Sequence, residues 1–353
     1  RCVALAYHHW RLKLNHAELA EKVHVLLDHH AAVDQFSGAL LIAYEHQPIL
    51  TTARGFAIHP DVLPNQSDTK FNIASVTKML TAVAVMQLVA AGKLDLHTPV
   101  AAYDRNLPHA SQITVHQLLT HTAGFGRYWN DAYRAARSDL RTVADYIKLF
   151  AATPLEFAPG TRHHYGNAGY VVLGAVIEQV TGVSYYDHMR QAVYQPAAMC
   201  DTDHFELDLP IANRAVGYTN QHWFGPTDGR RRANHFIYGV KGSPAEHCFS
   251  TVGDLFRFFQ ALQAHFLLDA RHTNLCFSPH AAAEQPGVSY GYGFHIIDDG
   301  RHGLVVGHGG RALGGDAFAL LYLDLGYTVA ILSNYDRPAA RRIVDHVADM
   351  LIA

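Results

Sequence analysis

Apolar positions in the first quarter of the chain change their spacing several times, and each change predicts a different element. Residues 15–33 repeat apolar side chains every three to four positions, which predicts an amphipathic helix. Residues 36–44 are almost continuously apolar and residues 49–54 follow after a turn, so the two segments predict an antiparallel hairpin. A polar loop over 59–70 leads to residues 79–92, which are apolar on nearly every side and predict a buried helix.

The rest of the chain divides into a helical middle and a strand-rich end. Residues 95–182 are mainly helical in pattern, and a Gly-rich and aromatic stretch over 213–242 predicts irregular structure. Another helix is expected to begin at 250–254. The remaining expected elements are short helices over 114–120 and 168–181, strands over 290–297, 304–307, 317–323 and 327–333, and a final helix over 338–352.

Strands near both ends of the chain, with helices between them, predict one antiparallel sheet assembled from both termini. We therefore expect an α/β (α+β) fold in which residues 1–94 and 245–353 form a mixed lobe. Residues 95–244 would form a mostly helical lobe, with the functional site between the two. No fixed-period repeat and no low-complexity linker divides the chain further.

Composition excludes several classes of function. Hydrophobic residues make up 49% and charged residues 17% of the 353, which is typical of a globular protein. The formal net charge of -3 gives no reason to expect a nucleic-acid partner, and no apolar run reaches the length of a membrane span. The four cysteines form no C-x-x-C pair, so no zinc ribbon, redox motif or disulfide can be assigned: Cys2, Cys200, Cys248 and Cys276.

Histidine is unusually abundant, with 26 copies. They are spread along the whole chain and form no H-E-x-x-H motif. We therefore expect no metal and no cofactor, although a metal-dependent hydrolase remains the alternative that the histidines suggest.

The chemistry is concentrated in Ser75-Val76-Thr77-Lys78, an S-x-x-K motif at the start of the buried helix. Residues three apart on a helix share a face, so the lysine amine can reach the serine hydroxyl. Burial lowers the pKa of a lysine, so a neutral amine could accept the proton of Ser75. The alternative is that Ser75 only caps the helix.

Two more segments accompany this motif. Tyr165-Gly166-Asn167 precedes the helix over 168–181, and His308-Gly309-Gly310 follows an apolar strand. Taken singly, each has a structural explanation: a core tyrosine, a helix cap or a glycine turn. No G-x-S-x-G motif is present, so an α/β-hydrolase triad is not supported. A loose G-x-G-x-x-A at Gly307 is not followed by a helical pattern, which argues against a dinucleotide site.

In this order the three motifs resemble the serine β-lactamase and penicillin-binding-protein superfamily, and most of all its class C-like branch. That branch contains class C β-lactamases, D-alanyl-D-alanine carboxypeptidases, D-aminopeptidases and family VIII esterases. The resemblance covers nearly the whole chain. It implies a serine hydrolase acting on a small ester, peptide or lactam. It also favours a periplasmic or secreted location, although no signal peptide is visible, and it leaves the oligomeric state open.

The resemblance also implies roles for individual residues. Ser75 would be the nucleophile and Lys78 would take its proton. Tyr165 would be the second acid/base group, with its phenol pKa lowered by the nearby cation. The substrate would be bound by the remaining motif residues, with the backbone N–H groups of Ser75 and of the residue after the third motif as the oxyanion hole: Asn167, His308, Gly309, Gly310 and Arg311.

One departure bears on the substrate. His308 stands where the β-lactamases usually carry lysine, and a histidine is only partly charged near neutral pH. This favours carboxylic esters or D-amino-acid peptides and amides over β-lactams. A catalytically silent descendant that only binds remains an alternative, and His121, Tyr128 and Trp129 are interpreted as packing or pocket walls.

Overall fold

The computed structural model describes residues 15–60, 62–221 and 229–353. Its centre is an eight-stranded antiparallel sheet with the strand order β2-β1-β14-β13-β12-β11-β10-β9. The strands of this sheet are β1 (Gly38–Tyr44), β2 (Gln47–Arg54), β9 (Ala281–Ala282), β10 (Val288–Tyr290), β11 (His295–Asp298), β12 (Leu304–Ala312), β13 (Gly315–Tyr322) and β14 (Tyr327–Ser333). β1 pairs with β14 from Gly38 opposite Ser333 to Tyr44 opposite Tyr327, so the two ends of the chain share one sheet, as predicted.

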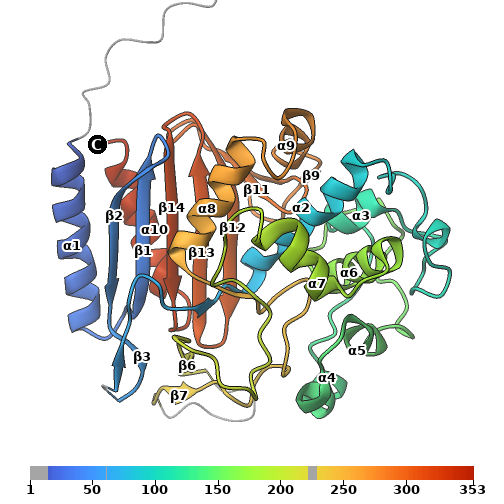
Figure 1. Ribbon diagram of the computed structural model, residues 1–353, viewed down its shortest axis with the longest axis horizontal. Coiled ribbons are helices and arrows are strands. Elements are labelled where there is room, and N and C mark those ends of the chain that lie inside the picture. The colour runs from blue at the N-terminus through green and yellow to red at the C-terminus, as the bar shows by residue number, and fades with distance from the viewer. Residues whose placement is uncertain (1–14, 61, 222–228) are drawn as a thin grey trace, which may run out of the picture.

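Helices cover both faces of this sheet (Figure 1). On one face α1 (His16–Ala32) and α10 (Ala339–Met350) pack together, and on the other α8 (Val252–Gln263) crosses β1, β13 and β14. The period-2 alternation of strand side chains separates the two cores. In β1, Leu40 joins the core under α1 and α10, while the next residue, Leu41, joins the core on the α8 side.

The second group of helices lies beyond the far end of the sheet and is joined to it through α2 (Figure 1). These helices are α2 (Thr77–Ala90), α3 (Val115–Leu119), α4 (Asp131–Ala136), α5 (Val143–Lys148), α6 (Ala168–Thr181), α7 (Tyr185–Met189) and α9 (Ala270–Cys276). α6 packs against α2, α3, α5 and α7 and is buried along most of its length. The N-terminal ends of α2 and α6 are therefore brought together, and both carry predicted site residues.

Short elements complete the chain. They are the helical turns η1 (Ala74–Val76), η2 (Val100–Ala102), η3 (Arg137–Asp139) and η4 (Arg190–Tyr194), and the strands β3 (Phe56–Ile58), β4 (Leu63–Pro64), β5 (Phe71–Asn72), β6 (Tyr218–Thr219), β7 (Arg232–Ala233) and β8 (Phe249–Ser250). The predicted loop over 59–70 thus contains β4, and the predicted irregular stretch over 213–242 contains the β6–β7 pair.

Two of the strand predictions were wrong in extent. The segment 290–297 is not one strand, because a hairpin turn separates β10 from β11. Gly293 adopts a φ of 84° there, and the Gly291 N–H donates to the Phe294 carbonyl at 2.8 Å. β12 does not stop at Gly307 but continues to Ala312, so the third motif lies within a strand.

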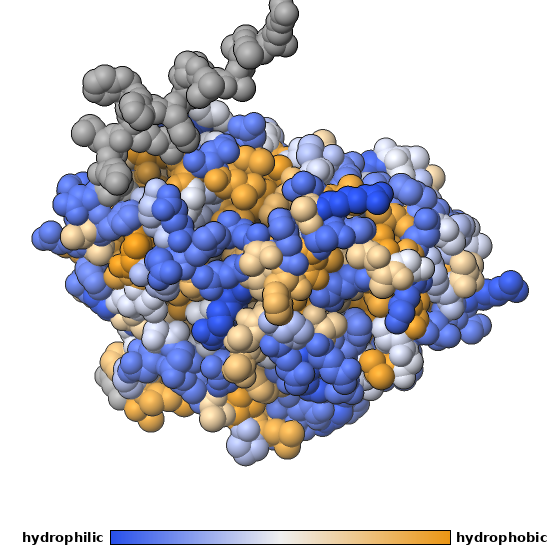
Figure 2. Space-filling view, turned by 45° about the horizontal axis from the view of Figure 1, so that its top comes forward, coloured by the Kyte–Doolittle hydropathy of each residue, from blue (hydrophilic) through white to orange (hydrophobic). Residues whose placement is uncertain are grey.

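The surface mixes polar and apolar side chains (Figure 2). Large exposed apolar residues are scattered over several elements, from Val25 on α1 to Phe266 after α8. None of the helices that the structure describes combines the length and apolarity needed to cross a membrane.

Candidate active site

Ser75 lies in the tight turn η1, which directly precedes α2, and not on the α-helix itself. The backbone is fixed on both sides of the serine. Ala74 adopts a left-handed φ of 47°, which is rare for a residue with a Cβ and often marks a functional site. The Asn72 side chain accepts from the Ala74 N–H at 2.8 Å, and the Thr77 hydroxyl donates to the Ala74 carbonyl at 2.6 Å. Ser75 is not the cap of α2, because that position belongs to Val76.

Lys78 is fully buried on the first turn of α2, directly beneath the serine. Its Nζ has three oxygen neighbours: Ser75 Oγ at 3.0 Å, Asn167 Oδ1 at 2.8 Å and the Ala245 carbonyl at 2.8 Å. An amide oxygen and a carbonyl can only accept, so they take two N–H groups of the amine. The third tetrahedral position of Nζ faces the Ser75 hydroxyl.

Burial lowers the pKa of Lys78 from 10.5 to about 7, while the charge of Glu246 opposes this decrease. The predicted lowering is therefore confirmed, and its cause is the predicted one. A neutral Lys78 keeps two N–H groups for Asn167 and Ala245 and presents its lone pair to Ser75. The arrangement can remove the proton from the serine hydroxyl without help from a histidine.

Glu246 is the carboxylate of this site, and the sequence analysis missed it. It is buried, and its Oε1 accepts from the Trp129 indole at 2.9 Å and from the Tyr128 hydroxyl at 3.1 Å. Burial raises the pKa of Glu246, and the Lys78 charge and the Asn167 side chain lower it in part. Asn167 therefore lies between Lys78 and Glu246. Its side-chain oxygen accepts a hydrogen bond from the Lys78 amine, and its amide nitrogen faces the Glu246 carboxylate.

A sequence signal for Glu246 did exist. The residue is a lone acid in a segment of small and apolar residues, directly before the predicted helix start at 250–254. An acid in such a segment is buried and needs partners. Tyr128 and Trp129, interpreted from sequence as packing or pocket walls, are those partners, and both also line the cavity of the site.

Asn167 occupies the cap position of α6, yet its side chain makes no capping hydrogen bond. The amide is committed to Lys78 instead. The side chain of Asn167 therefore does not act as a simple helix cap, and it accepts a hydrogen bond from the buried lysine.

Tyr165 lies over the lysine, with Nζ 4.9 Å from the centre of its ring. Its hydroxyl is buried and has no hydrogen bond of ordinary geometry among the described residues. Burial raises the pKa of Tyr165, and the nearby Ser75 hydroxyl only partly opposes this. The prediction of a lowered phenol pKa was wrong, because loss of hydration outweighs the Ser75 hydroxyl and the Arg337 charge, which lower it. Tyr165 therefore stays protonated near neutral pH and can act as a proton donor.

The third motif lies on the half of β12 that borders the site. β11 pairs with β12 from Leu304 to Gly307, whereas residues 308–312 pair only with β13. This half is therefore a local sheet edge, and it is not the glycine turn that was considered. At Gly310 a Cβ would come within 2.2 Å of the Ile73 carbonyl, so glycine lets the strand touch the serine turn.

His308 does not supply a charge at this edge. Its ring is buried, with Nδ1 2.6 Å from the Gly309 carbonyl and Nε2 3.1 Å from the Tyr290 hydroxyl. Burial, and the positive charge that His295 or Lys78 would carry if protonated, hold the pKa of His308 well below its ordinary value. The expectation of a partly charged histidine was therefore wrong: the ring is neutral, donating through Nδ1 and accepting through Nε2.

A cavity of about 830 Å³ opens above these groups. Ser75, Tyr165 and Asn167 line it together with Glu246, and on the opposite side lie His308, Gly309 and Arg311. Lys78 is beneath the lining and Gly310 faces the serine turn, so these two predicted site residues do not contact the cavity. Cationic residues that the sequence analysis did not select add to the lining: Arg127 and Arg337.

Within the described residues no group of three or more histidine, cysteine, aspartate or glutamate side chains could hold a metal ion. The described cysteines are free: Cys200 is exposed and both Cys248 and Cys276 are buried. Cys2 lies outside the described residues.

Comparison with known proteins identifies the family of the chain. A penicillin-binding protein from Bacillus halodurans is 31% identical, with a TM-score of 0.82 over 91% of this chain and 98% of that chain. Esterase EstB from Burkholderia gladioli is 29% identical over 91% of this chain and 92% of its own sequence. Penicillin-binding protein 4* from Bacillus subtilis is 27% identical over 85% of this chain and 68% of its own length. The family model "Beta-lactamase" matches residues 26–353, and the chain belongs to that family.

Proposed function

We propose that this protein is a serine hydrolase that forms an acyl-enzyme on Ser75. The observation that carries the proposal is the placement of the Lys78 amine. It is fully buried and 3.0 Å from Ser75 Oγ, with two fixed acceptors on its other sides. Such an amine is oriented to accept one particular proton, that of the serine hydroxyl.

In the proposed acylation, neutral Lys78 takes the Ser75 proton as Oγ attacks the substrate carbonyl carbon. The resulting oxyanion would be bound by backbone N–H groups of Ser75 and Arg311 at the junction of η1 and β12. When the carbon–leaving-group bond breaks, Tyr165 donates its proton to the departing oxygen or nitrogen and recovers one from protonated Lys78. Water then attacks the acyl carbon and gives a proton to Lys78. Protonated Lys78 returns that proton to Ser75 Oγ as the bond between Oγ and the acyl carbon breaks, which releases the acid and regenerates the Ser75 hydroxyl and neutral Lys78.

We propose carboxylic esters or D-amino-acid peptides and amides as the substrate class. The resemblance to EstB over nearly both full lengths supports an ester. The neutral His308 supports the same choice, because this position offers no charge to the carboxylate of a β-lactam.

Hydrolysis of β-lactams is the second candidate, and a separate observation favours it. Arg311 and Arg337 line the same cavity as Ser75. A guanidinium group binds a carboxylate well, so either arginine could replace the missing lysine charge.

The proposal is tested by parallel assays of a p-nitrophenyl ester, a β-lactam and a D-alanyl peptide with the unaltered protein and with Ser75→Ala. We expect the ester to be hydrolysed fastest and all turnover to be lost in the variant, while its far-UV circular dichroism is unchanged. Undiminished turnover by Ser75→Ala would overturn the assignment of the nucleophile. Faster turnover of the β-lactam would select the second candidate.

A further inference from the structure

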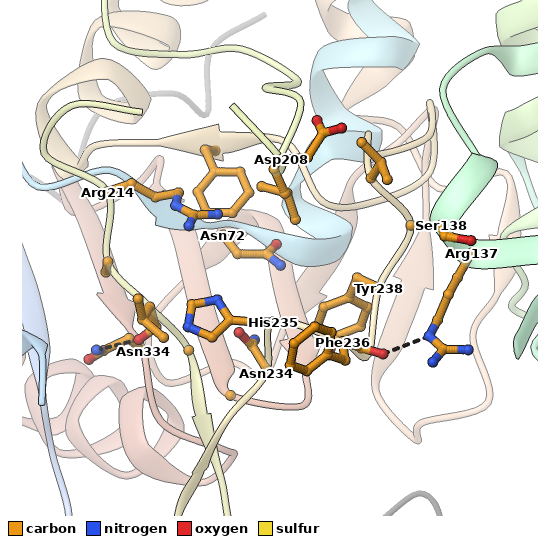
Figure 3. A pocket seen from close by; sticks show the side chains of 18 of the residues that line it. Asn72, Arg137, Ser138, Asp208, Arg214, Asn234, His235, Phe236, Tyr238 and Asn334 are labelled. Atoms are coloured by element: carbon orange, nitrogen blue, oxygen red, sulfur yellow. Dashed lines mark hydrogen bonds between the residues drawn. The ribbon is translucent and has the colours of Figure 1, made fainter. Parts of the chain in front are cut away.

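A second cavity, of about 750 Å³, lies on the other side of the serine turn and shares no lining residue with the first (Figure 3). Asn72 lines this second cavity, and its side chain holds the Ala74 N–H next to the nucleophile. The two cavities are also separated by a pair of rings. Tyr238 belongs to the second cavity and Trp129 to the first, and their ring centres are 5.6 Å apart. None of the proposed catalytic groups reaches the second cavity.

The lining of the second cavity carries an excess of positive charge. Among the described residues, Asp208 is its one carboxylate, and it is already bound by Arg141 at 2.6 Å. Arg137 and Arg214 both line the cavity, and neither forms an ion pair with a carboxylate in the part of the chain that the structure describes. The cavity therefore holds guanidinium charge that no described acid neutralises.

Arg214 is the more exceptional of the two. Arg137 donates to the Phe236 carbonyl at 2.7 Å, whereas Arg214 has no hydrogen bond from its guanidinium among the described residues. The Arg214 guanidinium lies 5.9 Å from the Phe249 ring centre, and burial lowers its pKa. His235 adds no charge, because burial and the Arg214 cation lower its pKa. A partly buried cation without an acceptor is a costly arrangement that an anionic ligand would relieve.

Part of the cavity wall is apolar and aromatic, among polar lining residues such as Asn72, Asn234 and Asn334. Phe249, Tyr238 and Leu207 line it, and Phe236 stands at the rim with 79% of its surface exposed. In Figure 3 Arg214 lies toward one side of the cavity, the rings of Phe236 and Tyr238 lie further along it, and Arg137 lies beyond them. A ligand with an anionic head and an apolar body would place its charge on Arg214 and its body on the two rings.

We propose that this second cavity is a binding site for a small organic carboxylate whose anionic group pairs with Arg214 and whose apolar part packs on Phe236 and Tyr238. The site is separate from the catalytic cavity, and the proposal does not depend on the reaction performed there. A bidentate pair between a guanidinium and a carboxylate supplies both affinity and orientation.

Isothermal titration calorimetry with 3-phenylpropionate tests the proposal on the full chain. We expect saturable binding, and we expect Arg214→Met to weaken it by about tenfold or more, since a charge-assisted hydrogen bond is lost. Arg311→Met is the matched control, because it removes a cation from the catalytic cavity. Arg271→Met removes an exposed cation on α9 and controls for the change in net charge. Both should leave the affinity unchanged.

The ligand itself provides a second comparison that needs no variant of a cavity residue. With the unaltered protein, 3-phenylpropionamide lacks the charge and inorganic phosphate lacks the apolar part, so both should bind at least about tenfold more weakly. Absence of saturable binding, equal binding of the amide or of phosphate, or an affinity unaffected by Arg214→Met would each overturn the proposal. Loss of binding in Arg311→Met instead would place the ligand in the catalytic cavity and would also overturn it.

Discussion

Replacement of Glu246 by glutamine should move the pH dependence of the reaction toward acid. The Glu246 charge raises the pKa of Lys78 against the effect of burial. An opposite charge within about 4–6 Å changes a pKa by roughly 1–3 units, so its removal should lower the pKa of Lys78 by at least about one unit. Glutamine retains an oxygen that can accept from Trp129 and Tyr128, so the local packing should survive.

The assay is the pH profile of kcat/KM for a p-nitrophenyl ester. Lys78 must be neutral to act, so the rate of the unaltered protein should rise through a pH of about 7. If the pKa of Lys78 falls by one unit, Glu246→Gln would retain roughly one half of its plateau rate at pH 6. The unaltered protein would retain a smaller fraction, down to roughly one tenth, because Glu246, whose own pKa is about 7, keeps part of its charge there. The direction of the shift follows from the charges. Without the Glu246 carboxylate, the protonated form of Lys78 loses a stabilising partner, so the pKa of Lys78 falls.

Glu284→Gln is the matched control. Glu284 lines the same cavity and is exposed at its mouth, but it does not contribute to the pKa of Lys78. Glu284→Gln should therefore leave the pH dependence of kcat/KM unchanged. An acid limb that stays fixed or moves toward higher pH in Glu246→Gln would refute the reasoning, as would an equal displacement in Glu284→Gln.

Three further outcomes are expected. Gly310→Ala should lower the free energy of unfolding by about 1–3 kcal/mol and should also slow ester turnover, because its Cβ would meet the Ile73 carbonyl. Urea titration measures the change in stability. Gly253→Ala is the control on α8, where there is room for a Cβ, and it should be neutral or stabilising. Tyr165→Phe should reduce kcat by roughly 100-fold with little change in stability, since only the proton donor is lost; a variant with normal kcat would exclude that role. Activity should be unchanged after dialysis against a chelator, and a loss that zinc restores would support the metal-dependent alternative.

Much of the fold could be predicted because its elements have strong local patterns. The buried runs at 36–44 and 327–333 indicated strands, and residues 38–44 of the first pair with the whole of the second. Apolar side chains all round α2 indicated a buried helix, and the burial of Lys78 followed from that. The turn between β10 and β11 was missed because both flanking segments are rich in tyrosine, phenylalanine and isoleucine, which hides the glycines.

The candidate site was predictable where one motif held the information and not where it depended on packing. The distance from Ser75 to Lys78 follows from a single turn of chain. The shift in the pKa of Tyr165 does not follow from a single motif. Its direction depends on how much water reaches the phenol, and four rings from distant segments pack around it: His121, Tyr290, His295 and His308. Glu246 was missed for the same reason, since its partners lie more than a hundred residues away in the sequence.

The most direct test of the account is the site of covalent modification by a fluorophosphonate, mapped by peptide mass spectrometry. We expect one phosphonyl group, carried by Ser75, with no labelling of Ser75→Ala and greatly slowed labelling of Lys78→Met. Labelling of another residue, or an unlabelled Ser75 in protein that still hydrolyses the ester, would contradict the claim that Lys78 makes this hydroxyl reactive.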